Sequence, residues 1–225
     1  MPRKSRIDTP GALHHIIARG IERRSIFADD HDRDDFLERL GTVILETGTV
    51  CFAWALIPNH FHLLLKTGNA PISTVMRRVL TGYAIGYNHR HRRSGHLFQN
   101  RFKSILCQED PYLKELVRYI HLNPLRAKIV PDLKSLNSYP YSGHSVLMGK
   151  IARKWQSTEY VLGLFGNDIR SGRRFPPGPE SPTRAAVLRR HRCAPRGPVP
   201  KRPQPGQDAG KSLPNCGFRQ DLDHS

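Results

Sequence analysis

Two histidines, His60 and His62, lie on either side of Phe61 in the apolar run from 55 to 66. In a β-strand successive side chains project to opposite faces, so both imidazoles would share one face while Phe61 packs on the other. Two neutral imidazoles at this spacing can reach one divalent metal ion, which would polarise an oxygen bound to it. However, the chain has twelve histidines, and an isolated His-x-His is more often surface sequence than a ligand pair. A metal site therefore requires further ligands elsewhere in the chain.

A predicted helix from Asp110 to Asn123 supplies the residue types that such a site lacks. Its apolar stripe consists of Leu113, Leu116, Val117 and Ile120. Tyr119 and Asn123 are four residues apart, so they lie on one face of the helix, beside that stripe. The Asn123 amide oxygen could complete a site with the two histidines, and the Tyr119 hydroxyl could attack a phosphate held there. A mixed imidazole and oxygen site with open positions suits Mg²⁺ or Mn²⁺.

Structural interpretations of these residues stand beside the chemical ones. Tyr119 fits the boundary of an amphipathic helix, where one end of a tyrosine is apolar and the other wet. Asn123 directly precedes Pro124, and that position favours a helix end over a ligand. His15 alternates with apolar neighbours in the first predicted strand and is interpreted as a buried core histidine. The spacing by itself leaves both interpretations of Tyr119 and Asn123 open.

Hydrophobic periodicity predicts an α+β fold. Strands are expected at 11–19, 49–57, 60–65 and 102–107, and helices at 30–46, 72–87 and 110–123. Asp29 and Asp30 start the first helix, Pro58-Asn59 forms the turn of a hairpin, and Pro124 closes the third helix. Strand, helix, hairpin, helix, strand and helix together predict a sandwich of helices on a mainly antiparallel sheet.

The chain divides by composition into three parts. Residues 1–130 carry the regular pattern and form the predicted catalytic domain. Residues 131–165 are expected to form an extension that packs back on it, through the run Tyr139–Ser142 and a short helix at 158–165. Ten prolines fall between 176 and 214 among arginines and glycines, with few apolar residues. Because such a segment cannot bury a core, residues 166–225 are predicted to be a disordered tail.

The charge balance narrows the class of partner. The formal net charge is +17 and the pI is near 10.3, a surface that attracts polyanions such as nucleic acid. The predicted phosphate-binding set consists of Arg77, Arg78, Arg90, Arg92, Arg93, Arg101 and Lys103. No apolar run approaches the roughly 20 residues of a membrane span, and the first residues lack the apolar segment of a signal peptide. We therefore expect a cytoplasmic protein without membrane contact.

Three motifs together resemble a known family. They are His60-Phe61-His62, the run GHLFQNRFKS from Gly95 to Ser104, and the run YIHLNPLRA from Tyr119 to Ala127. Their order and spacing are similar to those of the single-tyrosine HUH transposases, which are also called IS200-like transposases. The similarity is greatest to the bacterial group associated with repetitive extragenic palindromes (REP). It extends from about Pro2 to about Phe165.

The resemblance implies a ferredoxin-like fold and metal-dependent cleavage and joining of single-stranded DNA beside hairpins. It also implies a 5′-phosphotyrosine intermediate and a free 3′-hydroxyl leaving group. In family terms, His60 and His62 match the HUH histidines, Tyr119 matches the nucleophile, and Asn123 matches the third metal ligand. Relatives complete the site within one chain or with a helix from a second copy, so a homodimer is one assembly that the resemblance allows.

Two other functions fit parts of the sequence. A catalytically decayed or domesticated copy would still bind DNA hairpins by its basic surface without cutting them. The tail departs from the family pattern and favours this alternative, whereas the intact His60, His62, Tyr119 and Asn123 favour the enzyme. A zinc-binding structural protein is disfavoured because the four cysteines are far apart and no cysteine cluster accompanies the histidines.

Overall fold

The computed structural model describes residues 9–107 and 112–166 of the 225-residue chain. Its first part contains β1 (Leu13–Arg19), a 3₁₀ turn η1 (Ile21–Arg23), α1 (Asp30–Thr47), β2 (Val50–Ile57), β3 (His60–Lys66), α2 (Ile72–Arg90) and β4 (Lys103–Cys107). The strands form one sheet in the order β2-β3-β1-β4, and every neighbouring pair is antiparallel. This βαββαβ order is ferredoxin-like. It confirms the predicted α+β sandwich.

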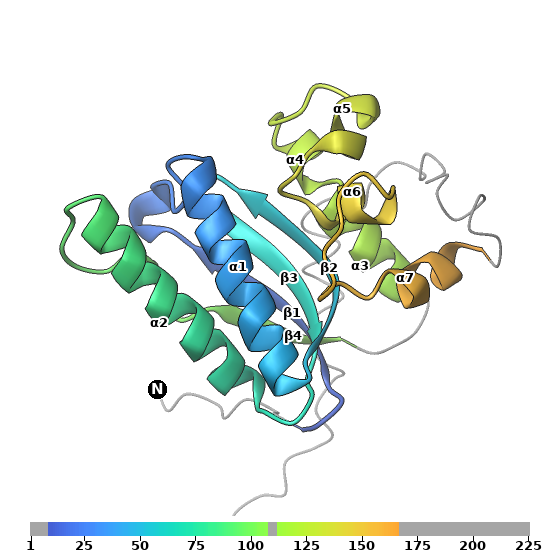
Figure 1. The fold of residues 1–225 in the computed structure, drawn as a ribbon, viewed down its shortest axis with the longest axis horizontal. Helices are drawn as coiled ribbons and strands as arrows, with labels where there is room; N and C mark the ends of the chain where they lie inside the picture. The colour runs from blue at the N-terminus through green and yellow to red at the C-terminus, as the bar shows by residue number, and fades with distance from the viewer. Residues whose placement is uncertain (1–8, 108–111, 167–225) are drawn as a thin grey trace, which may run out of the picture. The chain divides into compact units, whose positions relative to one another are not determined.

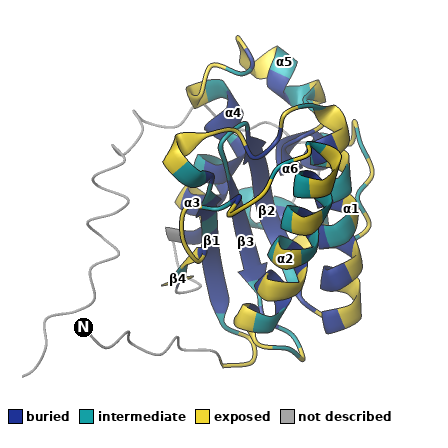
Figure 2. Cartoon of the chain, turned by 90° about the vertical axis from the view of Figure 1, so that its left-hand side faces the viewer, coloured by how far each residue is buried: buried dark blue, intermediate teal, exposed yellow. Residues whose placement is uncertain are grey.

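Helices α1 and α2 cover one face of the sheet (Figure 1). Phe61 of β3 points to this side, where its ring centroid lies 4.8 Å from that of Phe36 in α1. Phe36 also packs edge-on against Tyr83 of α2, with ring centroids 5.2 Å apart. As predicted, α1 starts after Asp29, whose side chain accepts a hydrogen bond from the backbone N–H of Asp32. Figure 2 shows the strands as the buried layer and exposed residues along the outer side of α2.

The second part of the chain contains five helices: α3 (Tyr112–His121), α4 (Asn123–Arg126), α5 (Leu133–Ser138), α6 (Gly143–Leu147) and α7 (Thr158–Phe165). The apolar stripe of α3 packs on the sheet face opposite α1 and α2. There Leu116 and Ile120 of α3 share a buried cluster with Leu64 of β3 and Ala53 of β2. The strand periodicity that sends Phe61 to one face therefore sends Leu64 to α3 on the other.

The prediction that Pro124 closes the third helix is wrong. Helix α3 ends at His121, and Pro124 occupies the second position of the separate turn α4. Proline has no backbone N–H, but in the first turn of a helix that donor lacks an intrahelical partner anyway. A proline can therefore open a helix as readily as it ends one. Asn123 is the first residue of α4, and the predicted helix start at Asp110 lies outside the described residues.

The segment after α4 covers the outer edge of β2. The backbone N–H of Leu56 donates to the Tyr141 carbonyl, and that of Ser157 donates to the Cys51 carbonyl, both at 2.9 Å. These bonds give partners to an edge that would otherwise be open. Helix α7 spans the residues predicted for it, whereas the sequence reading missed α5 and α6.

Two further sequence predictions concern the tail and membrane-spanning segments. The tail predicted at 166–225 lies outside the described residues, except for Gly166. Across residues 9–107 and 112–166, no helix has the combination of length and apolar character that a bilayer span requires.

Candidate active site

The hairpin turn at Pro58-Asn59 fixes the position of both histidines. Strand β3 begins at His60 directly after this turn. The Asn59 carbonyl accepts a hydrogen bond from the Gly20 N–H at 2.9 Å, which ties the turn to the end of β1. His60 and His62 share a sheet face with Leu64, which packs against α3. The two imidazoles therefore face the side of the sheet that carries α3.

The two rings differ in exposure but have similar polar contacts. His60 is half-buried, whereas His62 is 4% exposed. Their ring centroids are 5.1 Å apart, with planes at 78°. His60 Nδ1 lies 2.6 Å from Asn59 Oδ1, and His62 Nδ1 lies 3.0 Å from Nε2 of His15. Contacts at Nδ1 orient both rings so that a shared ligand would be bound through their Nε2 atoms.

Helix α3 brings Tyr119 to the same place. Its ring stands at 89° to the ring of His62, and the two centroids are 5.6 Å apart. Tyr119 is half-buried, because Leu116 and Ile120 take the helix positions that point into the core. The structure thus places the candidate nucleophile beside the histidine pair, from an element almost sixty residues downstream.

Asn123 lies one helical turn further along, at the start of α4. Its side chain is 8% exposed, and its Nδ2 donates to the Tyr119 carbonyl at 3.4 Å. Because the amide nitrogen is used by the backbone, Oδ1 is the atom that a ligand would meet. The Leu122 backbone between α3 and α4 keeps a helical conformation, so Asn123 stays close to Tyr119 although the helix assignment is interrupted.

These donors fit a divalent metal ion in type. Two imidazoles oriented through Nδ1 and one amide oxygen form a mixed nitrogen and oxygen set, with no thiolate among them. Among the described residues, no group of three or more His, Cys, Asp or Glu side chains could hold a metal. A metal site within these residues would therefore depend on the Asn123 oxygen in addition to His60 and His62.

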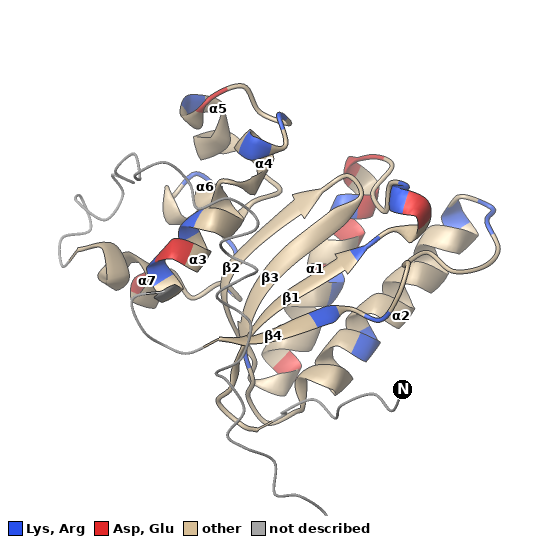
Figure 3. Cartoon of the chain, turned by 180° about the vertical axis from the view of Figure 1, so that it is seen from behind, with Lys and Arg blue, Asp and Glu red and all other residues tan. Residues whose placement is uncertain are grey.

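The predicted phosphate-binding residues do not form one cluster. Lys103 of β4 is opposite Ile17 in the sheet register, and Ile17 is opposite His62, so Lys103 projects from the histidine face. Figure 3 shows Lys and Arg positions in blue on β4 and along α2. Arg77 and Arg78 belong to α2, on the other face. The other members are Arg90 at the end of α2, Arg92 and Arg93 in the loop after it, and Arg101 before β4.

Several of these arginines already contact residues of the fold. Arg78 forms an ion pair with Glu46 of α1. Arg90 binds Asp29 at 2.5 Å and the buried Asp32 at 2.6 Å. Its hydrogen bond to Asp29, together with the one from the Asp32 backbone N–H, lowers the pKa of Asp29 to about 2. The Arg93 guanidinium lies 5.8 Å from the Tyr87 ring centroid. Arg78 and Arg90 therefore stabilise contacts between α1 and α2, whatever else they bind.

Three residues near the histidines were not in the predicted site. His15 was expected in the core, and it is buried, but its polar neighbour is His62. Arg19 is directly opposite His60 in the β1–β3 register. The Arg126 guanidinium lies 5.1 Å from the Tyr119 ring centroid. Alternation along β1 places His15 and Arg19 on one face, but only the β1–β3 pairing shows that this face is the one with the histidines.

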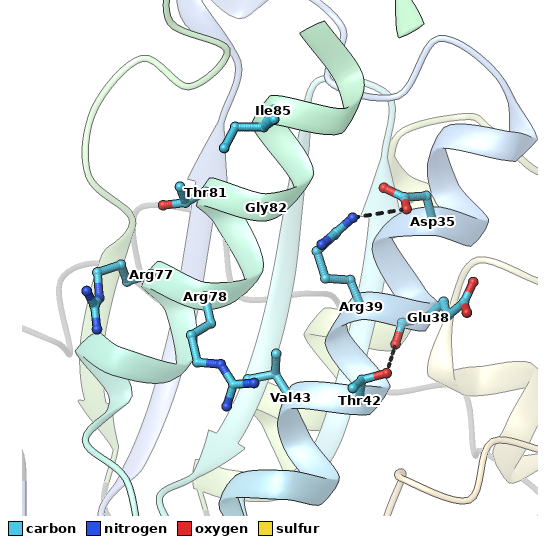
Figure 4. Close-up of a pocket in the computed structure, with 10 residues that line it drawn as sticks. All are labelled: Asp35, Glu38, Arg39, Thr42, Val43, Arg77, Arg78, Thr81, Gly82 and Ile85. Atoms are coloured by element: carbon cyan, nitrogen blue, oxygen red, sulfur yellow. Dashed lines mark hydrogen bonds and ion pairs between the residues drawn. The ribbon is translucent and has the colours of Figure 1, made fainter. Parts of the chain in front are cut away.

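Helices α1 and α2 line a groove (Figure 4). It is lined by Asp35, Glu38, Arg39, Thr42 and Val43 of α1 and by Arg77, Arg78, Thr81, Gly82 and Ile85 of α2. Arg39 contacts Asp35 at 3.4 Å, and Arg78 contacts Glu46. This groove lies on the sheet face opposite the histidines, so it does not belong to their site.

The arrangement of two histidines, a tyrosine and an asparagine can be compared with known families. The family model described as "Transposase IS200 like" matches residues 10–123, which is half of the chain and includes all four residues. The chain belongs to the IS200-like transposase family. It is therefore a transposase, an enzyme of DNA transposition and recombination. The sequence resemblance to this family is confirmed.

The search of solved structures returned matches to this IS200-like transposase, and one of them resembles it in fold. One is a REP-associated tyrosine transposase bound to a REP hairpin. It is 19% identical, has a TM-score of 0.54, and the match covers 70% of this chain and 92% of that one. Another, from Deinococcus radiodurans R1 and provisionally named a transposase, is 18% identical with a TM-score of 0.38, and the match covers 53% of this chain and 95% of that one. A search of curated proteins returned no match.

Proposed function

We propose that this transposase cleaves and rejoins single-stranded DNA beside hairpins, with Tyr119 as the nucleophile and a divalent metal ion at His60, His62 and Asn123. The observation that carries the proposal is the position of the Tyr119 ring, which stands across the ring of His62 at a centroid distance of 5.6 Å. A phosphate bound at the histidines would therefore lie beside the phenol. Attack at phosphorus needs this proximity between the nucleophile and the activated group.

The ion supplies Lewis-acid polarisation of a phosphate oxygen when it is bound, and Mg²⁺ or Mn²⁺ suits the donor set. The protein residues would bind the ion, and further contacts orient these residues. Asn59 and His15 hold the two imidazoles at Nδ1, and the Tyr119 carbonyl holds the amide of Asn123. These contacts reduce the reorganisation needed at the moment of binding.

The proposed step is a transesterification at phosphorus. The Tyr119 oxygen forms a bond to phosphorus and loses its proton, while the bond from phosphorus to the 3′ oxygen breaks and that oxygen takes up a proton. The 5′ side of the DNA then stays on Tyr119 as a phosphotyrosine. A 3′-hydroxyl can attack the same phosphorus and release Tyr119, so strands are rejoined without an external energy source.

We propose that the DNA backbone binds along the histidine face. Lys103, Arg19 and Arg126 border this face, and no ion pair of theirs with a carboxylate is found in the described part of the chain. Guanidinium groups bind phosphate oxygens in a bidentate manner, and they also stack on rings as Arg126 does on Tyr119. Arg78 and Arg90 contribute less, because carboxylates already bind them.

A DNA hairpin is the partner that best fits the comparisons. The similar REP-associated transposase was solved with a REP hairpin, and the match covers 70% of this chain. That likeness supports a structured single strand as the substrate class for this chain. The same surface would serve a copy that binds hairpins without cutting them, which is the competing function.

A covalent trapping experiment tests the proposal. The full chain is incubated with Mn²⁺ and single-stranded hairpin DNA that carries a label on the 5′-phosphate side of the cleavage site. We expect an adduct that survives denaturation and is absent with Tyr119→Phe, which keeps the ring but not the hydroxyl. An equal adduct with Tyr119→Phe would refute Tyr119 as nucleophile. Salt-sensitive hairpin binding without any adduct would favour the binding-only function.

A further inference from the structure

The contact between His15 and His62 is close to a straight hydrogen bond in the plane of both rings. The Nε2 of His15 and Nδ1 of His62 are 3.0 Å apart, the ring centroids are 5.2 Å apart, and the planes differ by 23°. An imidazole nitrogen lies about 1.1 Å from its ring centre, so a linear contact would give about 5.2 Å between centres. The rings therefore meet edge to edge.

The fold holds His15 at this place. It lies in the middle of β1, opposite Leu64, while His62 is opposite Ile17. The two histidines are therefore diagonal neighbours on one sheet face, within reach of long or aromatic side chains. His15 is 2% exposed, and the Tyr119 ring packs across it at 79° with centroids 6.4 Å apart.

The hydrogen bond between two neutral imidazoles has two directions. If His15 donates, the proton of His62 is on Nε2, and that nitrogen cannot bind a metal ion. If His62 donates from Nδ1, its Nε2 carries the lone pair that a metal requires. The direction of this one bond therefore decides whether His62 is a ligand.

His60, the other candidate ligand, donates from Nδ1, which is the arrangement that leaves Nε2 able to bind a metal ion. Asn59 Nδ2 donates to the Arg23 carbonyl at 3.2 Å, which directs Asn59 Oδ1 to Nδ1 of His60. Because Oδ1 can only accept, His60 must donate from Nδ1. If both histidines bind one ion through Nε2, both must carry the proton on Nδ1.

We propose that His15 is a positioning residue of the site: it accepts the hydrogen bond from Nδ1 of His62 and so fixes the tautomer and orientation in which His62 Nε2 can bind a divalent metal ion. This inference rests on the proposed function, since it gives His62 its metal-binding role. A core histidine with a structural role only would contribute to folding, but it would not determine which nitrogen of His62 carries the proton.

Three substitutions separate these roles. In His15→Gln the amide oxygen can take the position of Nε2 and still accept from His62. In His15→Asn the shorter amide corresponds to Nδ1 and does not reach, and His15→Phe keeps a ring without an acceptor. Thermal unfolding followed by circular dichroism identifies variants that are folded, and comparisons are made among those.

The readouts are the tautomer of His62 and the affinity for Mn²⁺, both measured on the full chain without DNA. Long-range ¹H–¹⁵N spectra should show His62 protonated at Nδ1 in the wild type and His15→Gln, and a shift toward Nε2 protonation in His15→Phe. Free Mn²⁺ measured by electron paramagnetic resonance should show affinity about 10- to 100-fold weaker for His15→Phe and His15→Asn, as is typical for loss of a residue that orients a ligand. His15→Gln should stay close to the wild type.

Two results would overturn the inference. One is a wild-type spectrum in which His62 is protonated at Nε2, and the other is a folded His15→Phe variant that binds Mn²⁺ as tightly as the wild type. A wild-type chain that does not bind Mn²⁺ at all would instead contradict the metal part of the proposed function. In that case the tautomer spectra still decide the role of His15.

Discussion

The side-chain nitrogen of Asn123 lies 3.4 Å from the backbone carbonyl of Tyr119 and donates to it. This bond connects the candidate ligand to the candidate nucleophile across the break between α3 and α4. Because the amide nitrogen donates to the backbone, the amide oxygen is the end that we propose as the ligand. The candidate ligand and the candidate nucleophile therefore depend on one short stretch of backbone.

Replacement of Asn123 should change the affinity for metal according to the oxygen that remains. Asn123→Leu removes the oxygen donor, and we expect Mn²⁺ binding to weaken at least tenfold, or about 1.4 kcal/mol. Asn123→Asp keeps an oxygen and adds a negative charge, so the affinity should be equal or higher. Titration with Mn²⁺ measures both. Equal affinity for all three chains would exclude Asn123 as a ligand.

Removal of the metal should separate cleavage from binding. With EDTA, or in His62→Ala, we expect cleavage of a hairpin substrate to be lost while salt-sensitive DNA binding remains, because binding relies on phosphate contacts. Addition of Mn²⁺ should restore the EDTA-treated wild type but not the variant. His89→Ala is a matched control, since His89 is an exposed residue of α2 on the other side of the sheet. Cleavage by His62→Ala at the wild-type rate would contradict the proposal.

Arginines on the two faces should differ in their effect on DNA affinity. Arg126→Ala removes a guanidinium beside Tyr119, and we expect the slope of log affinity against log salt to fall by about 0.7 for one lost contact to a single strand. Arg78→Ala, which breaks a pair with Glu46, should leave this slope close to the wild type. Fluorescence anisotropy at several salt concentrations measures both slopes. A larger effect from Arg78→Ala would place the DNA over α2 instead.

Stability should fall as the pH falls below neutral, because His121 at the end of α3 and His144 in α6 are buried. Burial lowers the pKa of His144 to about 4, and burial together with His144 lowers the pKa of His121. A histidine with a lowered folded pKa binds its proton more readily in the unfolded chain. Its contribution is therefore complete above the unfolded value near 6.5 and is lost between about 6.5 and 4.

For His144 alone, the shift corresponds to roughly 3 kcal/mol in unfolding free energy. His144 Nε2 lies 2.8 Å from Asn137 Oδ1, so His144→Gln can keep a donor in this region without titrating. Urea unfolding at pH 7 and pH 4.5 should show a smaller loss of stability for His144→Gln than for the wild type. The same loss in both chains would mean that other groups cause the acid sensitivity.

Sequence periodicity determined most of the fold. The alternation around Phe61 predicted that Phe61 faces the core and that His60 and His62 share the opposite face. The turn signal at Pro58-Asn59 predicted the hairpin that carries both histidines. These features follow from local physics, because side-chain period and turn geometry depend on a few neighbouring residues. The three motifs also identified the family, since their order in the chain does not depend on the folded structure.

Only the tertiary structure decided which residues surround the histidines. His15 read as a core residue because a sequence does not show which strands pair, and the β1–β3 register is what brings its ring to His62. Pro124 read as a helix end because the same residue can close one helix or open the next. Strand pairing places Arg19 opposite His60. The turn α4 after α3 places Arg126 beside the Tyr119 ring. Local sequence patterns do not determine which distant segments of the chain pair. In this chain the surroundings of the candidate site depend on such pairing.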